Sequence, residues 1–222
     1  MFADYFSRNN SYDVRFVAQN AEGKTTSAEV SASGNRNSIK GNGKLGAALI
    51  NRVKEAAEKI KCDYEDLLAI MYSESGINPA CGLKSDGSVA SAAGLVQFMD
   101  NGGIACLKQY YGIDVTREEL VRMSAVEQMY YVEKLLLACK KSAGYKSSDR
   151  LDGPTLYALI FLPGRARRDV LCVKGETGKN GKLLGYYEQN PVDYDKDGDI
   201  DKKDLAVRID KKHSEMKRQF FA

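Results

Sequence analysis

The sequence predicts a mainly helical protein with a small β component. Apolar residues recur at helical spacing in several segments of the 222-residue chain, which indicates amphipathic or buried helices. Two short stretches near the N-terminus alternate apolar and polar residues instead, and residues 170–187 are interrupted by glycines. These observations favour one helical domain, residues 44–170, with an N-terminal arm and a C-terminal extension over residues 171–222.

The N-terminal arm comprises residues 1–43. Residues 13–18 and 26–31 alternate and flank a turn-like segment, so we expect a β-hairpin, followed by a linker rich in Ser, Gly and Asn up to residue 43. An isolated hairpin is only marginally stable. The arm is therefore expected to pack on the main domain or to attach the protein to a partner, with an unfolded tail as the alternative.

The helices of the body follow from local signals in the sequence. An amphipathic face predicts a helix over residues 44–61, and a short helix is expected at 103–111. Two Ser/Thr-x-x-Glu capping boxes, at 116–119 and 124–127, each predict a helix start, and the second opens a long helix to about residue 141. Asp152 and Pro154 begin a further helix, apolar all round and hence buried, that ends before Pro163.

The stretch from residue 67 to 99 carries the main functional signal. A helix is expected to start after Asp63 and to stop at Gly76, which places Glu74 in its last turn. The negative end of the helix dipole and apolar neighbours would both raise the pKa of this carboxyl group. A glutamate that stays protonated near neutral pH can act as a general acid. The alternative is a solvated glutamate at a helix end.

This stretch resembles the catalytic core of the soluble lytic transglycosylases, a family related to goose-type lysozymes. In that family a helix ends in Glu-Ser, followed by Gly-x-Asn-Pro and, after a variable loop, by Gly-Leu-x-Gln. Here these are Glu74-Ser75, Gly76-Ile77-Asn78-Pro79 and Gly94-Leu95-Val96-Gln97, in the same order. The resemblance implies an α+β, lysozyme-like fold that cleaves the β-1,4 bond between N-acetylmuramic acid and N-acetylglucosamine in peptidoglycan.

The resemblance also implies roles for residues of this stretch. Glu74 would protonate the leaving oxygen and then take a proton from the muramic acid C6 hydroxyl, closing a 1,6-anhydro ring without a second carboxylate. Ser75, the Gly94-Leu95 backbone and Gln97 would bind the sugar. For Phe98 and Met99, a wall of the sugar cleft and core packing are both open.

Tyr157 matches the tyrosine that reaches the catalytic glutamate in this family, although the asparagine that follows it there is absent here. The pattern Leu-Tyr-x-x-x-Phe-x-Pro from Leu156 to Pro163 is similar to that of transglycosylase-like proteins of phage virions. This resemblance implies a phage tail or virion enzyme that acts on the bacterial cell wall. Residues 1–43 would then contact tail or baseplate proteins.

Two further carboxylates are candidates for the same site. Asp86 could activate a water molecule, as in some goose-type lysozymes, which would make the enzyme a hydrolase; a plain Asp-Gly turn is the alternative. Glu133 could orient groups in the cleft, with a solvated helical glutamate as the alternative. A non-enzymatic alternative is a structural virion protein that retains a lysozyme-like fold.

Residues 193–204 fit an EF-hand calcium loop, with Gly198 at position 6 and an apolar residue at position 8. Position 12 is an aspartate, which has a shorter side chain than the usual glutamate. Because Asn190 and Pro191 argue against an entering helix, we expect a single loop with structural Ca²⁺, followed by a basic helix over 205–221, and no cofactor for catalysis. The expected ligands are Asp193, Asp195, Asp197, Asp199, Asp201 and Asp204.

Composition and charge limit the other possibilities. No run of about 18 apolar residues is present, so we expect no membrane span, and the N-terminus lacks the features of a signal peptide. The net charge is +3, and residues 193–204 contribute −3, which leaves +6 on a body suited to an anionic polymer. No Lys/Arg stripe interleaves with aromatic residues, so nucleic acid is not the expected partner.

The cysteines predict neither a disulfide framework nor a zinc site, because their number is odd and their spacing wide. We expect buried free thiols at Cys62, Cys106 and Cys139. A cysteine nucleophile would need a histidine partner, and the single histidine, His213, lies in the charged C-terminal segment.

Overall fold

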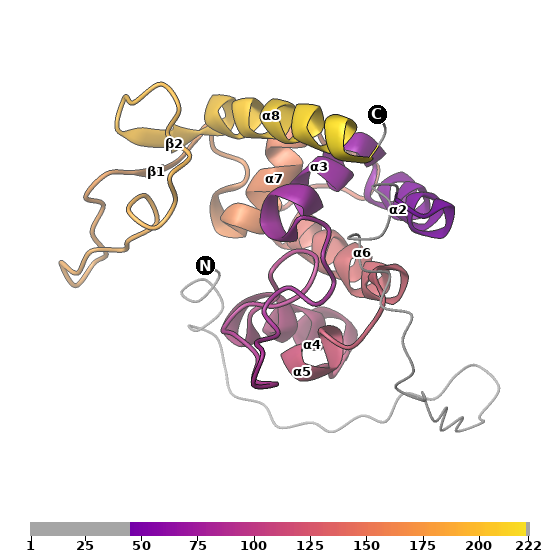
Figure 1. Cartoon of the computed structure of the whole chain (residues 1–222). Coiled ribbons are helices and arrows are strands. Elements are labelled where there is room, and N and C mark those ends of the chain that lie inside the picture. Colours follow the sequence, from indigo (N-terminus) through magenta and orange to yellow (C-terminus); the bar gives the residue numbers. More distant parts are fainter. Residues whose placement is uncertain (1–44, 221–222) are drawn as a thin grey trace.

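The computed structural model describes residues 45–220, so the hairpin arm and linker expected in residues 1–43 lie outside the described part. The described chain is mainly helical, with one small two-stranded sheet, as the sequence predicts (Figure 1). Its elements are α2 (Ala47–Ile60), α3 (Tyr64–Ser75), η1 (Asp100–Ile104), α4 (Ala105–Tyr111), α5 (Arg117–Leu120), α6 (Ala125–Ser142), α7 (Gly153–Phe161), η2 (Pro163–Arg165), β1 (Val170–Val173), β2 (Asp199–Asp201) and α8 (Lys202–Phe220).

Both ends of α3 follow the predicted signals. The Asp63 carboxylate accepts a hydrogen bond from the Glu65 N–H at 2.8 Å and so caps the first turn. The helix ends at Gly76, whose φ of 65° is a left-handed conformation that favours glycine. Residues 67–71 are all buried, so α3 is anchored in the core and its last turn, which carries Glu74, has a fixed position.

The capping boxes predicted for α5 and α6 are both present. At the start of α6 the Ser124 hydroxyl accepts from the Glu127 N–H, and the Glu127 carboxylate accepts from the Ser124 N–H. Thr116 and Glu119 make the same reciprocal pair at α5. The next helix, α7, starts after Asp152 with a proline in its first turn and is almost entirely buried, as its apolar sequence predicts.

The segment between α3 and α4 contains little regular structure. Leu83 and Val89 form an isolated antiparallel bridge across the Asp-Gly turn, which corresponds to the expected small hairpin. The helix expected over residues 103–111 is α4, preceded by the π-type turn η1. Ala93 and Phe98 form a second bridge, so the Gly-Leu-x-Gln segment is held as a tight loop.

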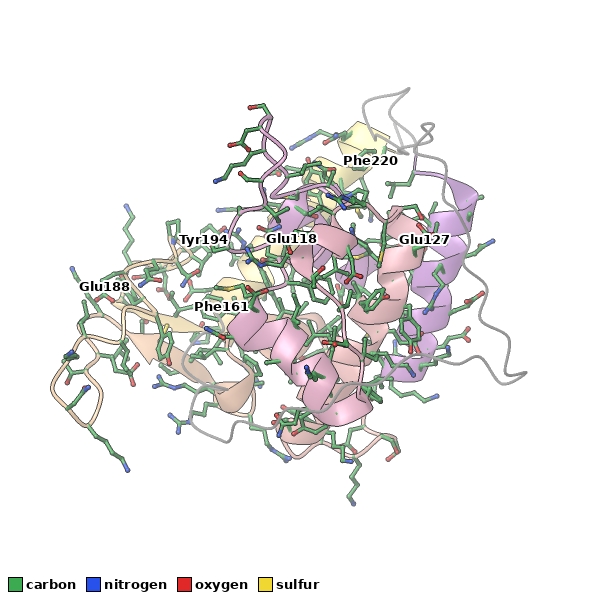
Figure 2. All side chains as sticks on the ribbon, turned by 90° about the horizontal axis from the view of Figure 1, so that it is seen from below. Glu118, Glu127, Phe161, Glu188, Tyr194 and Phe220 are labelled. Carbon is green, nitrogen blue, oxygen red and sulfur yellow. The ribbon has the colours of Figure 1, made fainter. Side chains whose placement is uncertain are left out.

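The C-terminal extension packs on the helical body. β1 pairs antiparallel with β2, and α8 begins at Lys202, earlier than the residue 205 expected from the sequence. Figure 1 shows α8 lying across α3 and α7, while α4 and α5 lie at the other end of the molecule. In Figure 2, Glu188 lies on the side that carries the strands and Phe220 at the far end of α8. The side chains of α8 that join the common core are Leu205, Ile209, Met216 and Phe220.

A buried ion pair joins α6 to α2. Glu133 is 2% exposed, and its carboxylate accepts from Arg52 Nη2 at 2.6 Å and from Lys59 Nζ at 3.2 Å. The solvated alternative for Glu133 is therefore wrong. The sequence pattern placed it on a less apolar face, but α2 covers that face and supplies the opposite charges.

Lys140 is also buried, at 2% exposure, and is paired with backbone oxygens instead of a carboxylate. Its ammonium donates to the carbonyl oxygens of Ile60 at 2.8 Å, Ser147 at 3.1 Å and Asp149 at 2.6 Å. An ammonium has three N–H donors, so each finds an acceptor. Burial lowers the pKa of Lys140. The side chain thus ties the end of α2 and the loop after α6 together.

All five cysteines are free, and Cys62, Cys106 and Cys139 are buried, as predicted. None of the helices described is both long enough and apolar enough to cross a membrane.

Replacement of Lys140 tests the role of its three carbonyl contacts. Lys140→Met leaves buried carbonyl oxygens without a donor, so we expect the free energy of unfolding to fall by about 2–4 kcal/mol. The matched control is Lys141→Met, an exposed neighbour in the same helix, which should change stability by less than about 0.5 kcal/mol. Urea unfolding of both variants provides the measurement, and equal effects would contradict the assignment.

Candidate active site

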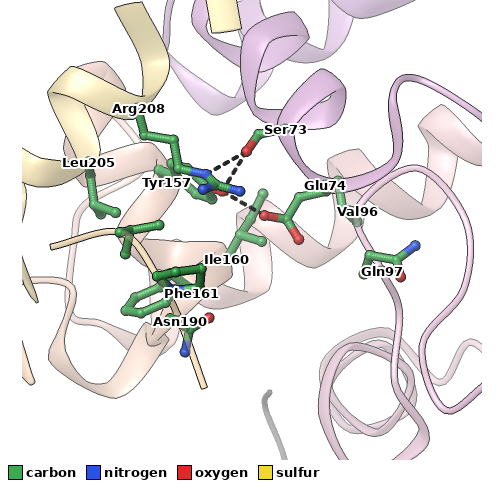
Figure 3. Close-up of a pocket in the computed structure, with 12 residues that line it drawn as sticks. Ser73, Glu74, Val96, Gln97, Tyr157, Ile160, Phe161, Asn190, Leu205 and Arg208 are labelled. Carbon is green, nitrogen blue, oxygen red and sulfur yellow. Dashed lines mark hydrogen bonds between the residues drawn. The ribbon is translucent and has the colours of Figure 1, made fainter. Parts of the chain in front are cut away.

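A cavity of about 280 Å³ lies beside the C-terminal end of α3 (Figure 3). Its wall combines the end of α3, the loop before η1, one face of α7, the segment after Tyr187 and the first turns of α8. The lining residues are Ser73, Glu74, Val96, Gln97, Tyr157, Ile160, Phe161, Asn190, Pro191, Val192, Leu205 and Arg208. The C-terminal extension therefore forms part of the wall.

The Glu74 carboxyl group faces this cavity from the last turn of α3. Its Oε1 atom accepts a hydrogen bond from the Tyr157 hydroxyl at 2.7 Å. Burial raises the pKa of Glu74, and this outweighs the opposing effects of the Tyr157 hydrogen bond and the positive charge of Arg208. The raised pKa agrees with the sequence argument, and burial is its main cause.

Ser73, Tyr157 and Arg208 form a hydrogen-bonded cluster behind the carboxyl group (Figure 3). Arg208 Nε donates to Ser73 Oγ at 2.7 Å and to the Tyr157 oxygen at 3.0 Å. Ser73 Oγ and the Tyr157 oxygen are 2.9 Å apart. Burial and the negative charge of Glu74 raise the pKa of Tyr157, so its hydroxyl keeps its proton and can donate it in a hydrogen bond.

The Gly-Leu-x-Gln segment is fastened to its surroundings by side chains. Ser75 Oγ donates to the Leu95 carbonyl at 2.9 Å, and the Leu95 N–H donates to Gln128 Oε1 at 2.9 Å. Gln97 has a φ of 54°, and its Nε2 donates to the Gly94 carbonyl at 3.0 Å. These bonds hold Gln97 in a left-handed turn at the cavity wall.

The structure brings together three of the residues expected to form the site, namely Glu74, Gln97 and Tyr157. Ser75, Gly94 and Leu95 do not line the cavity, since their polar groups are used to fasten the loop. Their hydrogen bonds position the loop within the protein, and the predicted sugar contacts of these three residues stay predictions.

Phe98 and Met99 do not line the cavity either. Phe98 is 1% exposed and belongs to the core. The prediction of core packing is therefore correct for this residue, and the prediction of a wall of the sugar cleft is wrong. Met99 is partly buried and lies at the start of η1, outside the lining of the cavity. The apolar wall is formed instead by Ile160 and Phe161 of α7 together with Val192.

The two additional carboxylate candidates are not part of this site. Asp86 is exposed, and its Oδ1 accepts hydrogen bonds from the N–H and the hydroxyl of Ser88 at 2.9 and 2.7 Å. These contacts correspond to the alternative of a plain Asp-Gly turn. These hydrogen bonds lower the pKa of Asp86. Glu133 is buried in its ion pair with Arg52 and does not line the cavity. Among the described residues, Glu74 is the only carboxylate that lines the cavity.

Ser73, Arg208 and the segment 190–192 line the cavity without having been predicted from the sequence. A signal for Arg208 was present, because it lies between Leu205 and Ile209 on the buried face of α8. A charged residue within an apolar stripe usually pairs with a polar group inside the protein. Its partner, however, lies in a different helix that the sequence pattern does not identify.

The Asp-rich loop places three of its six expected ligands together. Ligand atoms of Asp193, Asp195 and Asp197 lie within 4.8 Å of one another, close enough to share one cation. Gly198 has a φ of 94°, as expected for the glycine at position 6. No helix enters the loop, and β2 pairs with β1, so it is a single loop, as predicted.

The other expected ligands are arranged differently. Asp201 and Asp204 cap α8 reciprocally, because each carboxylate accepts a hydrogen bond from the other's backbone N–H, at 3.0 and 3.1 Å. Asp204 also accepts from the Tyr194 N–H at 2.7 Å and is 4% exposed. Asp199 Oδ1 is a buried oxygen without a hydrogen-bond partner among the described residues.

Comparisons with family models, with curated proteins and with solved structures find no match to this chain.

The raised pKa of Glu74 predicts a pH-dependent difference in stability between the wild type and Glu74→Gln. As pH rises above the ordinary value of 4.5, the unfolded wild type loses its proton before the folded protein does, so the wild type loses stability. The melting temperature of Glu74→Gln minus that of the wild type should therefore increase from pH 4 to pH 8.

Glu127→Gln is a control of opposite sign. Hydrogen bonds from Ser124 lower the pKa of Glu127, so its contribution is present above 4.5 and is lost as pH falls. The Gln variant should be less stable than the wild type at pH 8, and the difference should shrink towards acid. A flat profile for Glu74→Gln would show that its carboxyl group is not perturbed.

Proposed function

We propose that this protein is a lytic transglycosylase that cleaves the β-1,4 bond between N-acetylmuramic acid and N-acetylglucosamine in peptidoglycan, with Glu74 as its acid and base. The main support is a single half-buried carboxyl group with a raised pKa, at a cavity where no second carboxylate of the described chain is available. Hydrolysis by two carboxylates needs both at the scissile bond. An internal sugar hydroxyl as nucleophile needs only one.

In the proposed reaction Glu74 first donates its proton to the glycosidic oxygen. The resulting carboxylate is stabilised by the Tyr157 hydrogen bond at 2.7 Å and by the charge of Arg208. It then takes a proton from the C6 hydroxyl of the muramic acid, which attacks the anomeric carbon. Burial favours the acid form and the two donors favour the base form, so one group can serve both steps.

The finer fold assignment and the biological setting belong to this proposal. The resemblance of residues 74–97 to the transglycosylase motifs supports a lysozyme-like arrangement of residues 44–170, and the described helices are compatible with it. Delivery in a phage virion, with residues 1–43 bound to tail proteins, rests on the sequence resemblance. A hydrolytic lysozyme with Asp86 as base is not favoured, because Asp86 is an exposed turn residue outside the cavity.

We further propose that the Asp-rich loop binds Ca²⁺ as a structural ion. The clustered oxygens of Asp193, Asp195 and Asp197 are hard ligands of the type that Ca²⁺ prefers. Asp199, at position 7 of the loop, would add its backbone carbonyl oxygen. The ion would neutralise these charges and hold the loop that precedes α8, and no catalytic step passes through it.

The digestion products of purified peptidoglycan test the proposed reaction. The wild type should release muropeptides with 1,6-anhydro ends, detected by mass spectrometry, while Glu74→Gln should be slower by at least about 100-fold. Asp86→Asn is the matched control and should retain wild-type activity. Reducing ends would show hydrolysis instead, and no release by folded wild type would favour a virion structural protein.

Calcium binding can be measured by calorimetry and by thermal melting. At a free Ca²⁺ concentration about 100 times its Kd, the folded protein should gain about 2.7 kcal/mol, with a higher melting temperature that chelation reverses. The double variant Asp193→Asn/Asp195→Asn should lose this effect. Asp210→Asn, an exposed aspartate on α8 outside the loop, should keep it. Melting that is unaffected by chelation would contradict a structural ion.

A further inference from the structure

Arg208 constrains where the hydrogen atoms of the site can lie. A guanidinium group only donates hydrogen bonds, and its Nε carries a single hydrogen. This hydrogen is shared between Ser73 Oγ at 2.7 Å and the Tyr157 oxygen at 3.0 Å. Both oxygens must therefore act as acceptors towards Arg208.

The hydroxyl hydrogens of Ser73 and Tyr157 are then determined by the remaining partners. If Ser73 donates to Tyr157, the phenol hydrogen points to Glu74 Oε1, and both hydroxyl hydrogens have an acceptor. If Tyr157 donated to Ser73 instead, the Ser73 hydrogen would have no acceptor among the described residues. Since unpaired polar hydrogens in a half-buried site are costly, the first arrangement is favoured.

We propose that Arg208 is a positioning residue that, through Ser73 and Tyr157, fixes a donated hydrogen bond on Glu74 Oε1 and so leaves the transferable proton on Oε2. Figure 3 shows the second carboxyl oxygen pointing away from Tyr157. No hydrogen bond from the described chain reaches Oε2. The acid form then presents its proton to a ligand and not to the protein. The catalytic consequence rests on the proposed function, whereas the position of the proton does not.

Two groups of the described chain lower the pKa of Glu74, and they come from two neighbouring helices. Tyr157 of α7 donates to the carboxyl group, and Arg208 of α8 supplies the positive charge. Tyr194, in the Asp-rich loop, acts in turn on Arg208. Loss of the guanidinium removes both a charge and the N–H that orients Tyr157, and each loss favours the protonated carboxyl group.

The test separates charge from hydrogen bonding with variants of the full chain. Arg208→Met removes both, while Arg208→Lys keeps a positive charge but lacks the Nε hydrogen. Ser73→Ala removes the donor to Tyr157 and leaves Arg208 in place. Arg218→Met is the control, because it removes an exposed charge from the same helix away from the cavity.

Protonation is read directly by ¹³C NMR titration of carboxyl-labelled glutamate, with the Glu74 signal assigned by its absence in Glu74→Gln. We expect the titration midpoint of Glu74 to move upwards in Arg208→Met, less in Arg208→Lys and Ser73→Ala, and not in Arg218→Met. With peptidoglycan, Arg208→Met and Arg208→Lys should both lower kcat by at least about 10-fold, with KM changed less.

Unchanged Glu74 midpoints in folded Arg208→Met and Ser73→Ala would overturn the proposal. So would a loss of activity confined to KM, which would make Arg208 a substrate-binding residue only. Because NMR titration needs no substrate, a shifted midpoint in a protein that does not cleave peptidoglycan would uphold the positioning role of Arg208 and refute the proposed function alone. Ser73→Ala keeps the test decisive if Arg208→Met fails to fold.

Discussion

The packing of α8 across α3 and α7 joins the C-terminal part of the chain to the helix that ends at Glu74. α8 buries Leu205 and Ile209 in the common core, and this places Arg208 next to Tyr157 and Ser73. Without this contact the cavity would lose part of its wall and the Glu74 carboxyl group would lose its positive neighbour. The reciprocal caps of Asp201 and Asp204 fix the first turn of α8, so the Asp-rich loop and the cavity are connected through one rigid element.

Two opposing influences set the pKa of Glu74, namely its burial and the groups that stabilise its carboxylate. Burial alone favours a neutral Glu74, which has a proton to donate but holds it too tightly to release it readily. The Tyr157 hydroxyl and the Arg208 charge act in the opposite direction, although burial dominates. A group that must give up a proton and later recover one needs both influences, since either extreme would slow one of the two steps. This balance makes one carboxyl group sufficient in the proposed reaction.

Buried polar groups away from the cavity define how the helices meet. Gln128 accepts a hydrogen bond from the Leu95 N–H and donates hydrogen bonds to the Pro79 and Leu120 carbonyls. It therefore fixes the loop that carries Gln97. Glu133 with Arg52, and Lys140 with its three carbonyl oxygens, connect α6 to α2 and to the loop that follows α6. Each of these groups is costly to bury without its partners, and each therefore disfavours alternative packings.

The sequence by itself determined both ends of α3 and the starts of α5 and α6, although not the start of α8. Asp63, Gly76 and the two capping boxes act on backbone groups within one turn, so their effects are readable locally. The same holds for the glycine of the Asp-rich loop. Only the tertiary structure decided which side chains surround Glu74. Arg208 and Ser73 are 135 positions apart, and Phe98 was drawn into the core instead of the cavity wall. Such contacts depend on how helices pack against one another, and a pattern of period 3.6 gives the buried face of a helix but not the helix that covers it.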